Sequence, residues 1–596
     1  MPTPRVVAAI DVGTHAIGGG WAVISAANDD PAGRTIHLAN QWEAQPDPTA
    51  KNLSAVLLDA DDGMIAWGYQ ARLLWLTRGA ELSTQGAHYH QGFKMDLGAQ
   101  DEAAAPVVTV QDELCAETSS LLQESPRTDR VTLHLMTILL RQVVNATLEQ
   151  IKASGYDEYD VRWTLTCPAC FTDYQKSLLR DAGKNAGLPA EDGRVLLSLE
   201  PEAAAHFARV SGVHVVGDGN GSASDLLTPG ARFMVVDCGG GTVDITAYQI
   251  DPDGKMVEIG KSLGDRFGSD FINRAFERDH LTECLGGQAT LNNIKEKCPD
   301  ALLNLIDQWE RAKVSVKLDQ DDDINLQIPA AIDRVMGAAG RRHLARRQPK
   351  KNTTNIVLTP VQIHALFDTV VPGTLDLIET QLQEMNATRG DNKNPDVILL
   401  VGGFSSSPYL QQAVRERFGD RAKVMVPPNP ETAVLNGAVH FCYDPQVRAR
   451  RSRFTYGANC HLPFKEGVDP EAKRYVSPLG NVTCRDRFSA FATTGESIST
   501  EAEVVHEYWP LSLDTDVLEL RLYATRDPEP RYVTDDGCDE LATITVDLAS
   551  VQRFKDRRDR AVRLFMKFGE TEIKVRAELV NGDHEVATQI RFHSNY

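Results

Sequence analysis

The residues best suited to chemistry lie in two short glycine turns, each entered from an apolar run that ends in aspartate. The first turn reads DVGTH at residues 11–15, and the second reads DCGGGT at residues 237–242. Consecutive backbone N–H groups in such a turn can bind phosphate oxygens. A carboxylate at the strand end can hold hydrated Mg²⁺ through its waters, because Mg²⁺ loses water reluctantly. One such turn is usually an ordinary hairpin, but the repeat, with Gly402-Gly403 after a third apolar run, favours a nucleotide site.

Cys238, inside the second turn, raises the alternative of a redox cysteine on a flexible loop. We interpret it instead as a small apolar residue that points into the core beneath the turn. The chain has ten cysteines, scattered without a dense framework of short spacings. That pattern predicts reduced thiols in a cytoplasmic protein. The pair in Cys167-Pro-Ala-Cys170 is interpreted in the same way, as core or loop thiols.

The runs that flank the two turns also repeat. Residues 6–10 and 21–24 flank the first turn as candidate strands, and residues 233–236 and 245–250 flank the second. An internal repeat of strand, turn and strand predicts two similar lobes, each opening with a β-hairpin. We expect lobe I at about residues 1–210 and lobe II at about residues 231–444.

The pattern of predicted helices and strands changes near the last quarter of the sequence. Strands alternate with helices to about residue 441, which predicts an α/β architecture. From residue 454 the pattern is mostly of alternating strands, for example at residues 517–524, 542–548 and 573–579. In the last of these, one face is formed by Ile573, Val575, Ala577 and Leu579. We therefore predict a separate β domain, a sandwich, after the α/β part.

Charge and composition narrow the class of partner. The 596 residues carry a formal net charge of -21, which opposes nonspecific binding to nucleic acid or to an anionic membrane. The N-terminus lacks the apolar core of a signal peptide, and no apolar run approaches the roughly 20 residues of a membrane span. We predict a cytoplasmic protein that binds no nucleic acid and spans no membrane.

A competing nucleotide motif is incomplete. Residues 260–262 read GKS, like the end of a P-loop, but Lys255 stands where the first glycine of that motif belongs. The sequence therefore favours the repeated turns over a P-loop.

Several segments together resemble the actin-like ATPase superfamily and, within it, the seventy-kilodalton heat-shock chaperones. The two turns and LLVGGFSSSPYL at residues 399–410 resemble the phosphate and adenosine motifs. Further similar segments are CPACFTDYQKSLLRDAGKNAGL, SLEPEAAA, WERAK and NPETAVLNGA, beginning at residues 167, 198, 309 and 429. Within this family the sequence is most similar to the divergent twelfth subfamily. The similar segments are GFKMDL, RRSRFTYG and MKFGETEIKVRAE, which begin at residues 92, 450 and 566.

This resemblance implies a fold, a cofactor and partners. The expected fold is a duplicated actin-like (ribonuclease H-like) ATPase domain at residues 1–444, a basic linker at 445–454 and an all-β sandwich at 455–596. Since the sequence ends at Tyr596, we expect no helical lid. ATP or ADP with Mg²⁺ would bind between the lobes and be hydrolysed slowly. A client protein or peptide would bind the β domain, and cochaperones would be further partners.

The resemblance also implies roles for single residues. Asp11 and Asp237 would hold Mg²⁺ through water, Lys94 would position the attacking water, and Glu200 would orient water and metal. The residues around the phosphates would be Gly13, Thr14, His15, Gly239, Gly240, Gly241 and Thr242. Those bordering ribose and adenine would be Glu310, Lys313, Gly402, Gly403 and Ser406. The plainer alternatives are an exposed cation at Lys94 and a surface helix pair at Glu310 and Lys313.

Several positions depart from the family's pattern. His15 stands where the chaperones place a second threonine on the phosphate. Val314 and Ser406 stand where they place arginines beside the adenosine, so a stacking contact is missing. Residues 448–453 read RARRSR, in place of an apolar interdomain linker.

Three alternatives to a slow ATPase with a chaperone-like β domain stay open. One is a nucleotide-sensing scaffold with negligible turnover, which His15, Val314 and the basic linker keep open. The second is a small-molecule kinase of the same superfamily, against which the β domain and the WERAK helix argue. The third is a filament-forming actin relative, against which the β domain argues.

Overall fold

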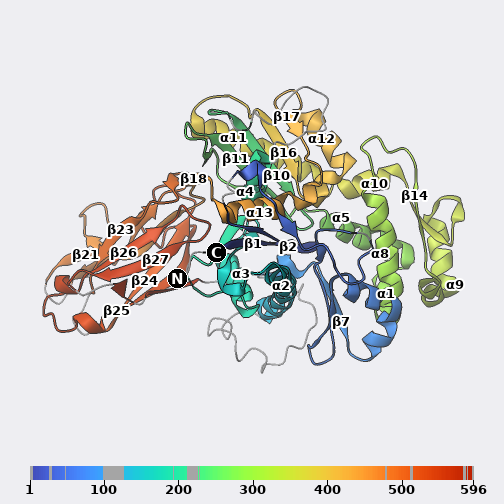
Figure 1. Cartoon of the computed structure of the whole chain (residues 1–596), viewed down its shortest axis with the longest axis horizontal. Coiled ribbons are helices and arrows are strands. Elements are labelled where there is room, and N and C mark those ends of the chain that lie inside the picture. Colours follow the sequence, from blue (N-terminus) through green and yellow to red (C-terminus); the bar gives the residue numbers. More distant parts are fainter. Residues whose placement is uncertain are drawn as a thin grey trace. The chain divides into compact units, whose positions relative to one another are not determined.

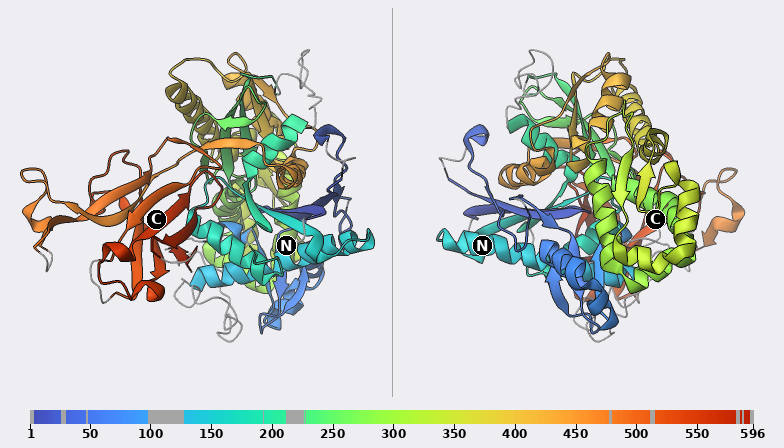
Figure 2. Two further views of the ribbon diagram at one scale, coloured as in Figure 1. Left: turned by 60° about the vertical axis from the view of Figure 1, so that its left-hand side comes forward. Right: turned by 90° about the vertical axis from the view of Figure 1, so that its right-hand side faces the viewer.

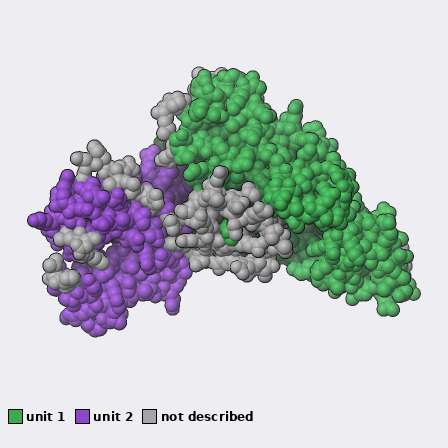
Figure 3. All heavy atoms as spheres, turned by 90° about the horizontal axis from the view of Figure 1, so that it is seen from below, with its two compact units in different colours: residues 1–170, 178–254, 263–446 green, residues 171–177, 255–262, 447–596 purple. Residues whose placement is uncertain are grey.

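The computed structural model divides the chain into two compact units (Figure 3). Unit 1 comprises Met1–Cys170, Leu178–Gly254 and Leu263–Gln446, and unit 2 comprises Phe171–Ser177, Lys255–Ser262 and Val447–Tyr596. The residues that the structure describes are 4–25, 30–46, 48–97, 127–191, 193–210, 226, 228–476, 480–510, 515–581, 585–586 and 588–592.

The first lobe of unit 1 is built on a five-strand path with β1 at its centre. β1 (Val6–Val12) pairs antiparallel with β2 (Ala16–Val23), which confirms the first predicted hairpin. On its other side β1 pairs parallel with β8 (Val161–Cys167), which pairs parallel with β9 (Val195–Leu199). Every residue of β1 is buried, as expected of an apolar strand inside a covered sheet. The short strands β3 (His37–Leu38) and β4 (Asn52–Leu53) both pair with β2.

The second lobe repeats this pattern. β10 (Arg232–Cys238) pairs antiparallel with β11 (Val243–Ile250), which confirms the second predicted hairpin. β10 also pairs parallel with β16 (Val397–Val401), which pairs parallel with β17 (Lys423–Met425). The order β2-β1-β8-β9 in lobe I thus has its counterpart in β11-β10-β16-β17 in lobe II. In both lobes the aspartate-glycine turn joins the central strand to its antiparallel neighbour.

Two helices pack together between the sheets of the lobes (Figures 1 and 2). α4 (Glu200–Val210) follows β9 in lobe I but also contacts β10 and β11 of lobe II. α13 (Ala433–Tyr443) follows lobe II in sequence but contacts β1 and β8 of lobe I. Each helix therefore crosses to the other lobe. α4 and α13 approach closely because small residues face each other, notably Ala203 and Gly437.

Gly437→Ala should destabilise unit 1 severely. A methyl group at Gly437 would lie 1.7 Å from the carbonyl oxygen of Ala203, so the helices would have to move apart. Overpacking of this kind costs about 3 kcal/mol or more when backbone cannot yield. We expect a lower melting temperature by calorimetry. Gly33→Ala is the matched control, because its methyl would meet nothing nearer than 3.6 Å; equal stability of the two variants would contradict the close packing.

Outside the central sheets, a helix of lobe I packs against a helix of lobe II. α1 (Gly68–Thr84) packs on a small sheet of β5 (Ala55–Leu58), β6 (Met64–Trp67) and β7 (His88–Gln91). It also packs against α8 (Pro299–Lys313) of lobe II. An ion pair between Arg72 on α1 and Asp307 on α8 joins the two helices.

The remaining elements of unit 1 surround this frame. Those used below are η3 (Phe93–Asp96), α5 (Asp270–Ala275), η9 (Gly403–Ser406) and α12 (Pro408–Phe418). The others of lobe II include α7 (Gln288–Lys297), α9 (Ala330–Arg347), β14 (Ile324–Gln327), β15 (Asn355–Leu358), α10 (Pro360–Phe367) and α11 (Val371–Arg389).

α2 (Arg127–Ala153) is a helix of 27 residues. Among the described residues, its part Arg130–Ala153 alone has the length and hydropathy of a membrane span. Two-thirds of that stretch is buried inside the protein, and α2 packs on β1, β2 and β5. This burial is typical of a core helix.

Unit 2 contains two antiparallel sheets that share one core. The larger has the order β20-β21-β19-β24-β25-β29, and the smaller has the order β23-β26-β27-β28. The shorter of these strands are β20 (Arg474–Val476), β23 (Val504–Tyr508), β28 (Glu585–Val586) and β29 (Thr588–Phe592). Their longest strands are β19 (Thr455–Pro463), β21 (Val482–Ala492), β24 (Val517–Thr525), β25 (Cys538–Asp547), β26 (Val562–Lys567) and β27 (Lys574–Leu579). Ile573, Val575, Ala577 and Leu579 face this core together, which confirms the alternation read from the sequence.

The basic segment expected as a linker contains a strand. β18 (Val447–Arg451) belongs to unit 2, where it pairs with β12 (Met256–Glu258) and β22 (Ser497–Ser499). The Arg451 backbone N–H donates to the Glu258 carboxylate at 2.6 Å, and the Arg450 guanidinium donates to the Gly569 carbonyl at 2.8 Å. The arginines thus have acceptors that allow an ordered strand.

Candidate functional site

One cavity in unit 1, of about 730 Å³, is lined by every residue to which the sequence assigned a role. The central strands, their turns and the start of α4 contribute Asp11, Gly13, Thr14, His15, Ala16, Glu200, Asp237, Gly239, Gly240, Gly241 and Thr242. Others come from η3, α8 and η9 of the two lobes. The structure therefore brings together residues that are up to about four hundred positions apart.

The first glycine turn is held from outside by Ser54. Its hydroxyl donates to the Gly13 carbonyl at 2.7 Å, and its backbone N–H donates to the His15 carbonyl at 2.9 Å. In a trans peptide the C=O and the following N–H point in opposite directions. Ser54 therefore fixes the N–H groups of Thr14 and Ala16 on the side of the turn away from itself.

The second turn is held by the start of α5. The backbone N–H groups of Ser269 and Asp270 donate to the carbonyls of Gly239 and Gly240 at 3.1 and 2.8 Å. By the same geometry, the N–H groups of Gly240 and Gly241 point away from α5. Consecutive N–H groups fixed in this way form the kind of nest that binds anions.

The two turns approach each other closely. A methyl group on Gly241 would lie 2.5 Å from the Thr14 hydroxyl oxygen and 2.6 Å from Cγ of Met95. Glycine at 241 therefore lets the turns of the two lobes, and η3, meet at one point. His15 lies beside them, with its Nδ1 4.0 Å from the Asp270 carboxylate and 45% of its side chain exposed.

Carboxylates dominate the floor of the cavity. Asp11, at the end of β1, accepts hydrogen bonds from the Thr166 hydroxyl at 2.8 Å and from the Lys51 ammonium. Asp237, at the end of β10, is 5% exposed, and no lysine, arginine or histidine within the described ranges pairs with it. Burial, reinforced by Glu200, Asp244 and Asp11, raises the pKa of Asp237 well above its usual value.

A buried ion pair lies beside these aspartates. The Lys94 ammonium, on η3, donates to the Glu200 carboxylate at 2.5 Å, and the Lys94 side chain is 3% exposed. Burial raises the pKa of Glu200 to about 7, since the charges of Asp244 and Asp11 add to desolvation and together outweigh the effect of Lys94. Lys94 is thus a buried member of the site, which removes the alternative of an exposed cation.

These side chains fit a divalent cation. Asp11, Glu200, Asp237 and Asp244 face only two lysines, Lys51 and Lys94, within the cluster. A buried carboxylate without a counter-ion is costly, and a cation offsets that cost. Among the described residues no three histidine, cysteine or acidic side chains form a direct metal cluster. These carboxylates therefore suit an ion such as Mg²⁺, which they can bind through the water molecules that the ion retains.

The far end of the cavity is polar and includes α8. The Lys313 ammonium contacts the Glu310 carboxylate at 2.9 Å and donates to the Asn273 side-chain oxygen at 2.9 Å. Burial favours a higher pKa for Glu310, but Lys313 and His15 lower it below its usual value. The helix pair Glu310–Lys313 is therefore not on the free surface. Val314 is 62% exposed, and Gly402, Gly403 and Ser406 line the same end.

Cys238 is fully buried, and burial raises the pKa of its thiol. A thiol held protonated is a poor nucleophile. The structure thus supports the interpretation of Cys238 as a small apolar residue beneath the turn.

Several residues of the site were missed from the sequence. Lys51, Ser54, Thr166, Asn273 and the start of α5 all contact residues that were predicted. None carries a local signal, because each contacts a partner at least 30 residues away in the sequence. Asp244 was visible at the end of the second turn; its carboxylate accepts the Cys170 N–H at 2.9 Å.

One family model and several known proteins are similar to this chain in sequence. A family model described as a domain of unknown function (DUF8340) matches residues 229–427. Human heat shock 70 kDa protein 12A is 26% identical over 632 residues, covering 96% of this chain and 89% of that protein. Human heat shock 70 kDa protein 12B is 27% identical, covering 99% of this chain and 91% of that protein. The chain is a homologue of the 70 kDa heat-shock proteins.

A match over part of the chain is to a bacterial protein. A protein named chaperone protein DnaK, from Stenotrophomonas maltophilia, is 30% identical over 305 residues, which is 50% of this chain and 41% of that protein. The resemblance seen in single motifs therefore extends over nearly the full length for the 12A and 12B proteins, and over half the chain for DnaK.

Proposed function

We propose that this protein binds ATP with Mg²⁺ in the cavity between its lobes and hydrolyses it slowly. The observation that carries the proposal is the pairing of two anchored glycine turns, each with an aspartate at its strand end, around the Lys94–Glu200 pair. The strand order of the lobes supports a duplicated actin-like (ribonuclease H-like) domain.

Each part of the cavity has a role in this proposal. The N–H groups of the turns, with Thr14 and Thr242, hold the β- and γ-phosphates. Asp11 and Asp237 hold Mg²⁺ through its waters. When bound, Mg²⁺ offsets the negative charge of the phosphates. The Lys94 ammonium lies close to the phosphate end, where it can orient a water and stabilise charge that develops in the transition state. Glu200 holds Lys94, and Glu310, Lys313 and η9 border the nucleoside.

We further propose that the β-sandwich of unit 2 binds a client protein or peptide under the control of nucleotide. The names of relatives as heat-shock and chaperone proteins support this role. The described cysteines have free thiols, which suits a reducing compartment such as the cytoplasm.

Isothermal titration and a phosphate-release assay test the proposed function together. The full chain should bind ATP, and in the presence of Mg²⁺ it should release phosphate. Neither binding nor phosphate release by the wild type at high protein concentration would refute the proposal.

Turnover should depend on pH through Glu200. Because its pKa is raised to about 7, Glu200 is mostly protonated at pH 6 and mostly ionised at pH 8. Only the ionised carboxylate holds the Lys94 ammonium by charge. We expect kcat/KM, which reports the free enzyme, to rise about tenfold between these pH values. Glu200→Gln should be slower and should lack this rise; a flat wild-type profile would contradict the assignment.

A nucleotide-sensing scaffold with negligible turnover is a second candidate. It is favoured by His15, whose exposed ring occupies the first phosphate turn. Single-turnover phosphate release separates the candidates, because a scaffold would bind ATP and release phosphate no faster than a Lys94 variant does.

A further inference from the structure

Lys51 is a second cation in the cavity, and no motif pointed to it. Its ammonium pairs with Asp11, and its side chain is 15% exposed, compared with 3% for Lys94. Lys51 lines the cavity together with Thr14, Glu200 and Asp237. Of the two lysines, Lys51 is therefore the more accessible to a ligand.

The backbone of β2 makes room for this lysine. Gly18 lies directly opposite Asp11 in the β1–β2 pairing. A methyl group on Gly18 would lie 2.8 Å from Cγ of Lys51 and 2.9 Å from the Ala50 carbonyl oxygen. The absence of a side chain at Gly18 thus gives the Lys51 stem a path across β2 to the end of β1. The backbone of β2 at Gly18 therefore helps to determine where the Lys51 ammonium lies.

Asp11 does not exhaust the hydrogen-bonding capacity of this ammonium. A lysine ammonium has three N–H donors, and the Asp11 carboxylate oxygen accepts one of them. Lys51 can therefore keep its contact with Asp11 and still donate toward an anion in the cavity. Because it pairs with Asp11, it also offsets much of the negative charge that would otherwise repel that anion.

We propose that Lys51 is a phosphate-binding residue that makes binding of a polyphosphate only weakly dependent on a divalent cation. This inference rests on the proposed function, since it concerns the same cavity. With Lys51 in place, the ammonium supplies part of the positive charge at the phosphates. Without it, Asp11 is an uncompensated carboxylate, and binding requires Mg²⁺ to supply that charge.

The test is calorimetric binding of ADP, and separately of inorganic tripolyphosphate, to the full chain with excess Mg²⁺ or excess EDTA. Lys51→Gln should weaken binding in EDTA by at least about tenfold, the size of one charge-assisted hydrogen bond. In Mg²⁺ the same variant should weaken binding by less than about threefold. Lys51→Arg keeps the charge and should retain binding in EDTA.

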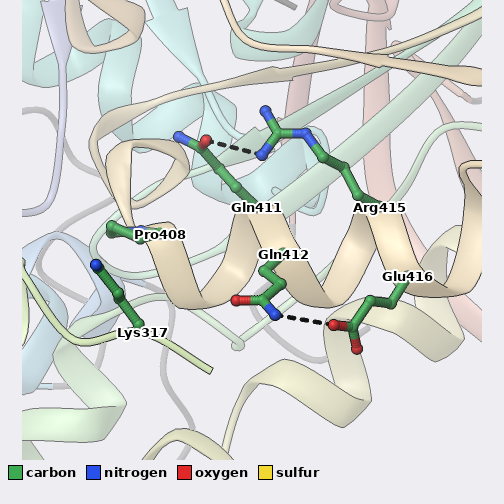
Figure 4. A pocket seen from close by; sticks show the side chains of 6 residues that line it. All are labelled: Lys317, Pro408, Gln411, Gln412, Arg415 and Glu416. Carbon is green, nitrogen blue, oxygen red and sulfur yellow. Dashed lines mark hydrogen bonds between the residues drawn. The ribbon is translucent and has the colours of Figure 1, made fainter. Parts of the chain in front are cut away.

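Lys317→Gln is the matched control. Lys317 lies in a shallow groove formed by residues of α12, including Gln411, Arg415 and Glu416 (Figure 4), and it does not line the nucleotide cavity. Lys317→Gln changes the net charge by the same amount as Lys51→Gln. It should leave the affinity in Mg²⁺ and the affinity in EDTA unchanged. Melting temperatures of all variants establish that they are folded.

The outcomes separate this inference from the proposed function. Equal weakening of Lys51→Gln in Mg²⁺ and in EDTA, or no weakening in either, overturns the role of Lys51 while leaving nucleotide binding intact. Failure of the wild type to bind ADP even with Mg²⁺ overturns both. A wild type that binds only with Mg²⁺ also overturns the inference about Lys51.

Discussion

Asp237→Asn should make the ligand-free protein more stable and the nucleotide site much weaker. The variant removes a buried charge that no described cation pairs with and that lies near Glu200, Asp244 and Asp11. The same charge is the one proposed to hold Mg²⁺ through water. We expect a melting temperature a few degrees higher and an affinity for ATP with Mg²⁺ about 10–100-fold lower, as for loss of an outer-sphere partner of a metal.

The gain in stability should itself depend on pH. A carboxyl whose pKa is raised by folding binds more protons in the folded than in the unfolded state. Its ionisation therefore lowers the free energy of unfolding as the pH rises above the ordinary pKa of aspartate. The advantage of Asp237→Asn should accordingly be larger at pH 8 than at pH 5.

Asp181→Asn is the control for this prediction. Burial raises the pKa of Asp181 as well, but Asp181 does not line the cavity. This variant should leave ATP affinity unchanged. If Asp237→Asn melts lower than the wild type at pH 8, or binds ATP with Mg²⁺ normally, the assigned role of Asp237 is wrong.

Lys94→Met should separate binding from turnover. Lys94 is proposed to stabilise charge in the transition state, and loss of such a group typically slows the chemical step by about 100-fold or more. ATP would still be held by both turns and by Mg²⁺. In single-turnover experiments we therefore expect phosphate release to fall by about that factor, while the dissociation constant for ATP changes by less than about tenfold.

A double variant controls for the loss of the buried ion pair. Lys94→Met leaves Glu200 without its cation, and breaking a buried pair costs up to about 3–5 kcal/mol. Adding Glu200→Gln should restore stability but not turnover. Lys176→Met, which removes the buried partner of Asp173 outside the cavity, should leave turnover unchanged. Phosphate release by Lys94→Met at the wild-type rate would contradict a catalytic role for Lys94.

Much of the frame could be predicted because its signals are local. The apolar runs before Asp11 and Asp237 are buried strands, and the glycines after them form the hairpin turns. The alternation of apolar residues at 573–579 likewise marks one face of a buried strand. In each case neighbours in the sequence determine the structure, so the pattern itself contains the information.

The remaining parts depend on contacts between distant segments. Lys51 reaches Asp11 only because Gly18 leaves a path, and Ser54 holds the first turn from a bend between β4 and β5, about forty residues away. The basic segment after residue 446 forms β18 because Glu258 and the carbonyl of Gly569 accept its donors. A sequence pattern records the charge of these arginines but not the acceptors that order them.

The central claim is that a nucleotide's phosphates bind between the two glycine turns. A crystal structure of the full chain with Mg²⁺ and a non-hydrolysable ATP analogue tests it most directly. The account predicts phosphates within hydrogen-bonding distance of the N–H groups of Thr14, Gly240 and Gly241, and a hydrated Mg²⁺ beside Asp237. Crystals grown with saturating nucleotide that show this cavity empty, or the nucleotide bound elsewhere, would contradict it.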